Sequence, residues 1–419
     1  MAYPSVDANQ GQMIYNNPKW AVSGANVVQG NKSSIGDQIV LDVFIKRALE
    51  DAAKEQYFTQ LSSTFAMPKN MGKTIKKNQY IPLLDARNVN DQGIDAAGVA
   101  KGTTNANGNL YGGSKDITTM TAGMPRLTEV GGRVNRVGFT RVVRESTIHK
   151  MGFFYEFTQE ALDFDSDAEL LAHMGREAVL GANELTEDMI GMELIAGAGV
   201  QVFTGSATSL ATMSAETGVT ASVVTYKDLQ KLAITLKENR APNKLQAISG
   251  SRIVDTKIVG SGYALYVGLP LEIQVRNLVD QFNNPAFIPV EKYAQGGNTL
   301  TGEIGAVGQF RIVVVPEMPE HRGKGVTATG TGLTTYRTTG SKYDAYPMLA
   351  VASEAFTTIG FQTGNAGAKF QMITKMPGAD HADRTDPYGE SGFTSIKWYH
   401  GMMIEKPEWI AVMYSLAAI

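Results

Sequence analysis

The chain has 419 residues, of which 43% are hydrophobic, and its formal net charge is −3. It contains no cysteine, which excludes disulfide bonds, thiol catalysis and thiolate metal sites. The small net charge provides no overall attraction to nucleic acid or membranes, and no run of about 18 apolar residues could span a bilayer.

The first part of the chain is predicted to form an arm and then a helix. Residues 1–34 are polar, with isolated aromatic side chains such as Tyr3, Tyr15 and Trp20. Exposed aromatic residues can anchor a polar segment on a partner surface. From Ser34 to Leu61, apolar residues recur near helical spacing, which predicts a helix.

A long segment of low complexity separates two predicted strands. The strands are Thr74–Asp85 and Arg133–Ser146, and about 45 residues from Asn88 to Gly132 lie between them. A loop of this length is uncommon inside a compact domain. It is either the lid of an enzyme or a hairpin that projects away from its own subunit.

Gly72-Lys73-Thr74 has the ending of a phosphate-binding loop, but its context argues against one. Such a loop needs a glycine five positions before Gly72, where this chain has Met67. The next residue, Pro68, has no backbone N–H to offer a phosphate. The loop should also open a helix, whereas a strand is predicted here. We therefore expect a turn between a helix and a strand.

One long helix dominates the middle of the chain. Ser166 and Glu169 fit a capping box, apolar residues then recur every three or four positions, and Gly197 and Gly199 end the pattern. Later elements are predicted from apolar periodicity and turn residues. They are a helix at Tyr226–Asn239 and strands at Leu271–Arg276, Phe310–Met318, Ala350–Gln362, Phe393–Ile404 and Glu408–Leu416.

No catalytic pattern is apparent. The five histidines show no metal-ligand spacing on one helix. Asp380, His381 and Asp383 could in principle hold a metal or exchange protons, but a polar surface loop is the simpler interpretation. No serine lies in a Gly-x-Ser-x-Gly turn. We therefore expect no enzyme activity, no cofactor and no metal.

Charges are distributed unevenly between the predicted hairpin and the long helix. This could reflect only solubility and protection of edge strands. Alternatively, a basic hairpin of one subunit lies over the acidic helix of its neighbour. The candidate contact residues under that hypothesis are Lys73, Lys76, Lys77, Arg133, Arg136, Arg141, Arg144, Glu177, Glu184, Glu187 and Asp188.

Three segments, in the order in which they occur along the chain, resemble segments of the major capsid proteins of tailed bacteriophages. The resemblance is greatest to those of short-tailed phages with large virion RNA polymerases. The three segments are "MPKNMGKTIKKNQYIPL" (Met67–Leu83), "TGEIGAVGQFRIVVVPEM" (Thr301–Met318) and "DPYGESGFTSIKWYHGMMIEKPEWIAVMYS" (Asp386–Ser415). The segments touch the beginning, middle and end of the chain, so the resemblance covers most of it.

This resemblance implies the α+β Johnson fold, with an N-terminal arm, an extended β-hairpin loop, a peripheral domain with a long spine helix, and a mixed α/β axial domain. The corresponding ranges are the arm with its helix at 1–60, the extended loop at 61–146, the peripheral domain at 147–220 with the spine helix at 166–197, the axial domain at 221–385, and C-terminal strands returning to the peripheral domain at 386–419.

The resemblance also implies a function and partners. The expected function is self-assembly into an icosahedral shell of hexamers and pentamers around double-stranded DNA. The shell would assemble in the host cytoplasm and become part of the virion. The DNA would be held without sequence specificity. Because the chain starts directly with the arm, scaffolding is expected to be a separate protein, beside a portal and a possible decoration protein. No local signature selects a Lys–Asn pair for covalent cross-linking. The alternatives are a cargo-enclosing shell of the same fold and a cytosolic hydrolase with a long lid.

Overall fold

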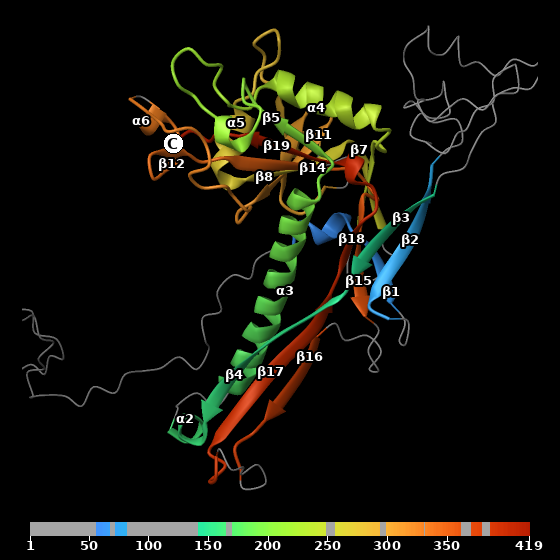
Figure 1. The fold of residues 1–419 in the computed structure, drawn as a ribbon, viewed down its shortest axis with the longest axis vertical. Coiled ribbons are helices and arrows are strands. Elements are labelled where there is room, and N and C mark those ends of the chain that lie inside the picture. The colour runs from blue at the N-terminus through green and yellow to red at the C-terminus, as the bar shows by residue number, and fades with distance from the viewer. Residues whose placement is uncertain are drawn as a thin grey trace, which may run out of the picture. The chain divides into compact units, whose positions relative to one another are not determined.

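The computed structural model describes residues 56–67, 72–81, 141–164, 170–248, 256–293, 299–330, 332–361, 370–378 and 386–419. All of them belong to one compact unit, Ala53–Ile419. Within it, the larger elements are a seven-stranded sheet, a long helix, two three-stranded sheets and the base of a hairpin (Figure 1).

The seven-stranded sheet is mixed. Strands β8 and β11 are parallel, as are β5 and β19, and the other neighbours are antiparallel. In spatial order the strands are β5 (Val200–Phe203), β19 (Ile410–Ser415), β14 (Tyr346–Val351), β8 (Tyr263–Gly268), β11 (Phe310–Val315), β10 (Glu303–Val307) and β9 (Phe287–Pro289).

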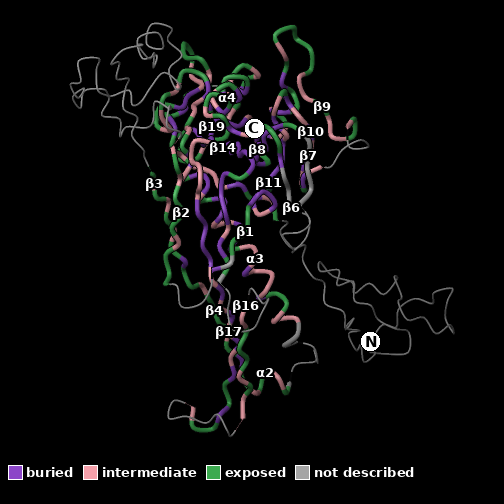
Figure 2. Tube along the Cα trace, turned by 90° about the vertical axis from the view of Figure 1, so that its right-hand side faces the viewer, coloured by how far each residue is buried: buried purple, intermediate pink, exposed green. Residues whose placement is uncertain are grey.

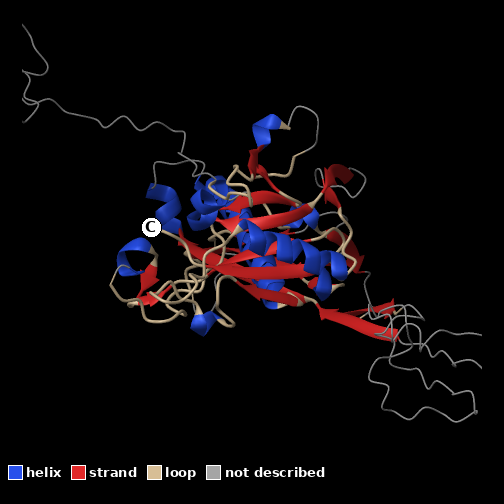
Figure 3. Ribbon diagram, turned by 90° about the horizontal axis from the view of Figure 1, so that it is seen from above, coloured by secondary structure: helices blue, strands red, loops and turns tan. Residues whose placement is uncertain are grey.

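Both faces of this sheet are buried along its central strands. Every residue of β8, β14 and β19 is buried, which matches their nearly continuous apolar sequences. Alternate residues face two separate hydrophobic clusters: on β8, Tyr266 joins one cluster and Leu265 the other. Helices α4 (Tyr226–Glu238) and α5 (Glu272–Arg276) cover the second face, and Figure 3 shows helices lying across the strands.

The long helix α3 (Leu170–Ala196) has 27 residues and is therefore about 40 Å long. Its C-terminal end contributes Ile190, Leu194 and Ile195 to the first cluster of the large sheet. Its middle packs on a three-stranded sheet through Ala182, against Ile396 and Trp398. That sheet consists of β16 (Phe370–Lys375), β17 (Ser391–His400) and β4 (His149–Thr158), and the short helix α2 (Gln159–Phe164) follows β4.

A second three-stranded sheet supports the hairpin base. It consists of β1 (Ser63–Met67), β15 (Phe356–Phe361) and β18 (Met402–Ile404). The hairpin base is formed by β2 (Thr74–Tyr80) and β3 (Arg141–Thr147), which pair along their full length. The remaining elements are small: β6 (Lys244–Ile248) with β7 (Thr256–Ser261), β12 (Thr338–Thr339) with β13 (Lys342–Tyr343), and α6 (Gly332–Thr335).

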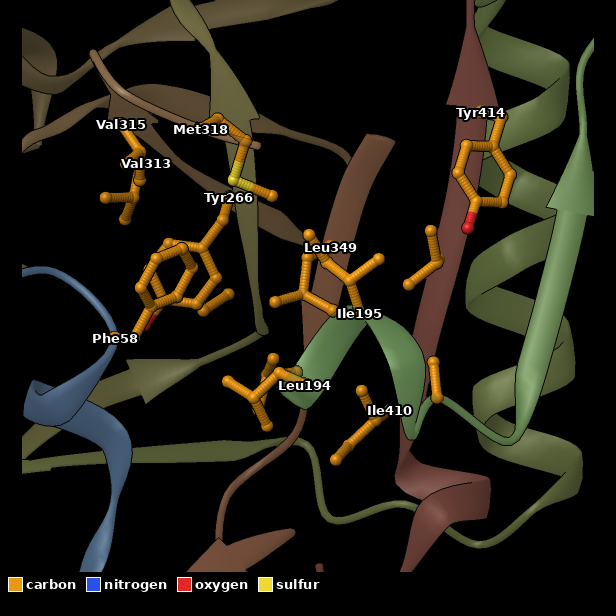
Figure 4. Close-up of a cluster of buried hydrophobic side chains, with 14 of the residues drawn as sticks. Phe58, Leu194, Ile195, Tyr266, Val313, Val315, Met318, Leu349, Ile410 and Tyr414 are labelled. Carbon is orange, nitrogen blue, oxygen red and sulfur yellow. The ribbon is translucent and has the colours of Figure 1, made fainter. Parts of the chain in front are cut away.

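The segment before β1 is docked deeply into this body. Phe58 is only 3% exposed, and its ring centroid lies 4.9 Å from that of Tyr266 (Figure 4). Leu194 of α3 belongs to the same cluster. A Cβ at Gly191 would lie 2.7 Å from the Phe58 ring, so this helix position requires glycine for the ring to pack.

Several predicted elements are confirmed. Helix α4 occupies Tyr226–Glu238, strand β11 begins at Phe310, and strand β2 begins at Thr74. The predicted capping box at Ser166–Glu169 lies outside the described residues, but α3 from Leu170 to Ala196 matches the predicted spine helix. Its end is also confirmed, since the N–H of Gly197 donates to the Glu193 carbonyl at 2.8 Å.

The predicted strand at Leu271–Arg276 is wrong. This segment forms the end of a 3₁₀ helix (Leu269–Leu271) followed by α5. Its alternating letters favoured a strand, but the buried residues are Leu271 and Val275, four positions apart, and Ile273 is exposed. An i,i+4 ion pair at 2.8 Å between Glu272 and Arg276 supports the helical turn.

Two other predicted strands are each divided between two sheets. Ala350–Gln362 splits into β14 and β15, which are separated by a turn in which Glu354 has φ 56°. Phe393–Ile404 splits at Gly401 into β17, which pairs with β4, and β18, which pairs with β15. In both cases the break is short, with Ser353 and Glu354 in the first segment and Gly401 in the second, so the sequence pattern did not reveal the change of sheet.

The helix predicted from Ser34 to Leu61 falls mostly outside the described residues. Its described end, Gln56–Leu61, contains only a 3₁₀ turn at Thr59–Leu61. The strands after residue 386 do not all join one sheet, because β17 pairs beside β4 whereas β19 lies in the seven-stranded sheet.

Candidate inter-subunit surfaces

The hairpin base is fixed to its own body. Lys77 Nζ lies 2.6 Å from Glu405 Oε1, and the same oxygen accepts a hydrogen bond from Thr357 Oγ1 at 2.6 Å. Ser146 Oγ donates to the Met402 carbonyl at 2.6 Å, which ties β3 to β18. The direction in which the chain leaves β2 and enters β3 is therefore set by the second three-stranded sheet.

The two strands of the hairpin base are otherwise largely exposed (Figure 2). Lys73 and Arg141 are exposed, and Arg144 Nε donates to Gln79 Oε1 at 3.3 Å. Lys76 and Glu145 form a 3.3 Å ion pair in which both side chains are more than 60% exposed, so the pair adds little stability. Arg133 and Arg136 lie outside the described residues.

The acidic residues predicted on the long helix have different environments. Glu177 is exposed, whereas Glu184 and Asp188 are half-buried. Glu187 is 7% exposed. Its carboxylate accepts hydrogen bonds from the Phe58 N–H, from the Thr59 N–H at 3.1 Å and from the Thr59 hydroxyl. The expectation that Glu187 lies on a solvated or partner-facing surface is therefore wrong.

Sequence reasoning missed this internal role because the partners are 128 and 129 positions away. Three further contacts fix the same segment. Tyr266 Oη donates to the Tyr57 carbonyl at 3.0 Å, and the Gln60 amide exchanges hydrogen bonds with the backbone of Thr301 at 2.9 and 3.3 Å. The described end of the N-terminal region, Tyr57–Leu61, thus acts as an anchor that we call the arm anchor.

A second surface missed by the sequence lies on the outer side of β4 and β17. Phe154 is 63% exposed there, and Ile373 on β16 is also exposed. A hollow of about 560 Å³ lies on this side of the sheet. Its lining includes Gly152, which has no side chain, together with Phe154, Phe393, Lys150 and Lys397. Exposed apolar groups framed by lysines are typical of a surface that contacts another protein.

The polar clusters of the described residues hold loops in place. Glu216 accepts hydrogen bonds from the Thr329 hydroxyl, from Tyr343 Oη at 2.7 Å and from the Thr329 N–H at 2.8 Å. These bonds lower the pKa of Glu216. Burial, aided by Glu216, raises the pKa of Tyr343 to about 12. Glu303 has a fully buried side chain that pairs with Arg311 at 3.0 Å and accepts from Tyr293 Oη at 2.7 Å.

No metal-binding group of three or more His, Cys, Asp or Glu residues occurs in the described ranges. Asp380, His381 and Asp383 lie outside those ranges. At the Gly-Lys-Thr sequence, Gly72 has φ 81°, the Lys73 carbonyl accepts from the Ile148 N–H at 3.0 Å, and Thr74 starts a strand. A turn was predicted before this strand, but the described element that precedes it is strand β1 and not the predicted helix. Among the helices that the structure describes, none is long and apolar enough to cross a membrane.

Comparison with known proteins places these features in one family. Residues 141–413 match the family model described as phage capsid protein. The chain is 51% identical to the major capsid protein of Pseudomonas phage KPP21 over 390 residues, covering 93% of this chain and 96% of that protein. The capsid structure of Ralstonia phage GP4 shares the fold, with a TM-score of 0.55 at 13% identity, covering 94% of this chain and 98% of that one. The chain therefore belongs to the phage capsid protein family.

Proposed function

We propose that this chain is the major capsid protein of a tailed phage, and that copies of it assemble into the icosahedral shell around double-stranded DNA. The observation that carries the proposal is the 51% identity to a major capsid protein along nearly the whole of both chains. A structural role is favoured over a hydrolase by this family membership. The three sequence segments described above further support the subgroup of short-tailed phages with large virion RNA polymerases.

The physical mechanism is the division of an outward load over many modest contacts. The described body is held together within one chain by a sheet buried on both faces and by the long helix. The hairpin base is fixed at Glu405 and Met402. We propose that the segment between β2 and β3 extends from this fixed base across a neighbouring copy.

Charge complementarity is proposed for part of that contact. Lys73 and Arg141 on the hairpin base and Glu177 on α3 are exposed in one copy. Opposite charges on facing surfaces steer association and fix its register more than they add affinity. Glu187 is not part of this proposed contact, because its carboxylate binds the arm anchor.

The finer assembly is also part of the proposal. The range 221–385 would lie near the centres of hexamers and pentamers, and 147–220 at their periphery. Scaffolding and portal proteins would be separate partners, a decoration protein could bind the finished shell, and assembly would take place in the host cytoplasm. The DNA would be enclosed without sequence recognition.

Electron microscopy of the purified chain, expressed with and without its scaffolding protein, tests this function. Closed shells support the proposal, whereas a monomer or small oligomer under every condition in light scattering favours the hydrolase. Mass spectrometry of purified particles separates the other alternative, because a genome shell carries DNA and a portal whereas a compartment carries enzyme cargo.

The charge contribution needs its own variant. Arg136→Glu with Arg141→Glu should reduce shell yield at physiological salt while monomer stability stays within about 0.5 kcal/mol of wild type. Lys227→Glu with Lys324→Glu is the control, since it changes the charge equally at exposed residues outside the hairpin. Equal yields for the two double variants would disprove the complementarity.

A further inference from the structure

A rigid turn presents one aromatic side chain to solvent. Phe282 is 83% exposed. Asp280 Oδ1 accepts hydrogen bonds from the N–H of Phe282 at 2.8 Å and of Asn284 at 2.9 Å. The Asp280 N–H donates to the Asn284 carbonyl at 2.8 Å, and Asn283 takes φ 61° to close the turn. The turn is thus locked locally, so exposure of the ring does not reflect a lack of backbone contacts.

Phe282 is not an isolated exposed apolar residue. Leu269, Ile273 and Val279 precede it closely in the chain and are each at least 49% exposed. Single exposed apolar residues are normal, whereas a contiguous patch of them indicates an interaction surface. These four residues are neighbours in sequence, which favours such a surface. A preorganised aromatic residue is also the type of side chain that most often dominates binding energy at protein interfaces.

A groove lies beside helix α4, on the face of the seven-stranded sheet that α4 and α5 cover. It has a volume of about 530 Å³ and lies between helix α4 and the turn that joins β10 to β11. Its walls are mainly apolar and include Leu229, Ala233, Ile234, Val307 and Phe310. This volume falls within the roughly 300–1,000 Å³ of clefts that bind small molecules, so it has room for one aromatic side chain.

Two polar features of the groove bear on its occupant. Lys237 lines it and offers a positive charge to an acidic partner. Gln309 also lines it, and the Oε1 atom of Gln309 is buried without a hydrogen-bond partner among the described residues. A buried acceptor without a donor is unfavourable by about 1–3 kcal/mol, so we expect a hydrogen-bond donor, from solvent or from an occupant, at this position.

We propose that the Phe282 turn of one copy inserts into the α4 groove of a second copy, with Asp280 facing Lys237. The turn matches the groove because it brings an aromatic ring and a carboxylate, while the groove brings apolar walls and a lysine. Hydrogen bonds to backbone N–H groups lower the pKa of Asp280, which keeps it charged at neutral pH. Each copy carries both the turn and the groove, so the contact can repeat from head to tail around a closed ring.

The inference rests on the proposed self-assembly, which it deepens by naming one contact. The absence of native cysteine allows a direct test. Phe282→Cys and Ile234→Cys are introduced together, since both side chains are exposed, and purified shells are oxidised. A ladder of multimers that disappears on reduction is expected, because a disulfide forms only when the two Cα atoms approach within about 7 Å. Neither single variant should give a ladder.

Tyr388→Cys with Ile234→Cys is the matched control, because Tyr388 is 81% exposed and lies outside the Phe282 turn. The inference would be overturned if shells of the Phe282→Cys, Ile234→Cys variant stayed unlinked. It would also be overturned if the Tyr388→Cys, Ile234→Cys variant gave a ladder of equal extent. If the wild-type chain forms no shells, the proposed function fails instead. Cross-linking of the Phe282 pair in concentrated solution would then still support the contact, and its absence there would count against it.

Phe282→Ala provides an independent measurement. The concentration needed for assembly should rise about tenfold, as for loss of an interface hot spot. The thermal unfolding of the isolated chain should not change, because the side chain makes almost no contact within one copy. Assembly at the wild-type concentration would contradict the proposal.

Discussion

Replacing Glu187 with alanine tests the arm anchor most sharply. Glu187 is 7% exposed, and its carboxylate accepts three hydrogen bonds from Phe58 and Thr59. A hydrogen bond to a charged group contributes about 1.5–3 kcal/mol, and contributions within one cluster are not additive. We therefore expect the free energy of opening Tyr57–Leu61 to fall by about 2–3 kcal/mol, which corresponds to about a 30- to 140-fold larger open population.

Hydrogen–deuterium exchange followed by mass spectrometry measures this opening. The peptide that covers Phe58–Leu61 should exchange about 30- to 140-fold faster in Glu187→Ala than in wild type, while peptides from α4 stay unchanged. Glu177→Ala, an exposed position on the same helix, should alter exchange by no more than about twofold. Wild-type exchange in Glu187→Ala would refute the anchoring role. Should that variant unfold as a whole, Glu187→Gln, which keeps an acceptor, would replace it.

Three further predictions concern packing, the buried ion pair and pH. Gly191→Ala should lower the free energy of unfolding by about 1–3 kcal/mol in a urea titration, because its Cβ would lie 2.7 Å from the Phe58 ring. Gly181→Ala is the control, because nothing lies within 4 Å of the added Cβ, and it should raise the free energy of unfolding by about 0.5–1 kcal/mol. Arg311→Met should lower it by about 3–5 kcal/mol, because the buried carboxylate of Glu303 loses its partner, and Glu303→Gln in the same chain should recover part of the loss. Stability should also fall as pH rises from about 10 to about 12. Burial raises the pKa of both Tyr343 and Tyr346 to about 12, so across this range the unfolded chain has lost protons that the folded chain still holds. Tyr343→Phe should make that fall smaller, and an unchanged pH profile in this variant would contradict the assignment.

The elements that sequence reasoning predicted well are those with one consistent period. In α4, Leu229, Leu232, Ala233 and Leu236 all face one cluster, so the helical spacing is unambiguous. The long helix likewise keeps its apolar spacing and ends at a glycine. Strand β11 was predicted because its apolar run is bounded by turn residues.

The failures occurred where one predicted strand serves two environments. In Ala350–Gln362 and Phe393–Ile404, the chain passes from one sheet to another at a break of only one to four residues, which was too short to end the predicted strand. In Leu271–Arg276, exposure of Ile273 broke the rule that apolar residues face the core. Period alone does not indicate which sheet or face a residue joins.

The candidate surfaces were predictable only in part. The basic residues of the hairpin base could be found from local charge. They lie on two strands whose side chains are largely exposed, so their charge indicates their position at the surface. Glu187 could not be distinguished from Glu177, because its backbone partners lie far away in the sequence. The Phe282 turn and the α4 groove likewise depend on exposure in the folded chain, which no local pattern reveals.

The central claim is that the segment between β2 and β3 lies across an adjacent copy. An electron cryo-microscopy reconstruction of assembled shells, with residues 82–140 traced, tests it most directly. We predict that this segment contacts the long helix of a neighbouring copy. A trace in which it folds back over its own body as the cover of a pocket would contradict the account.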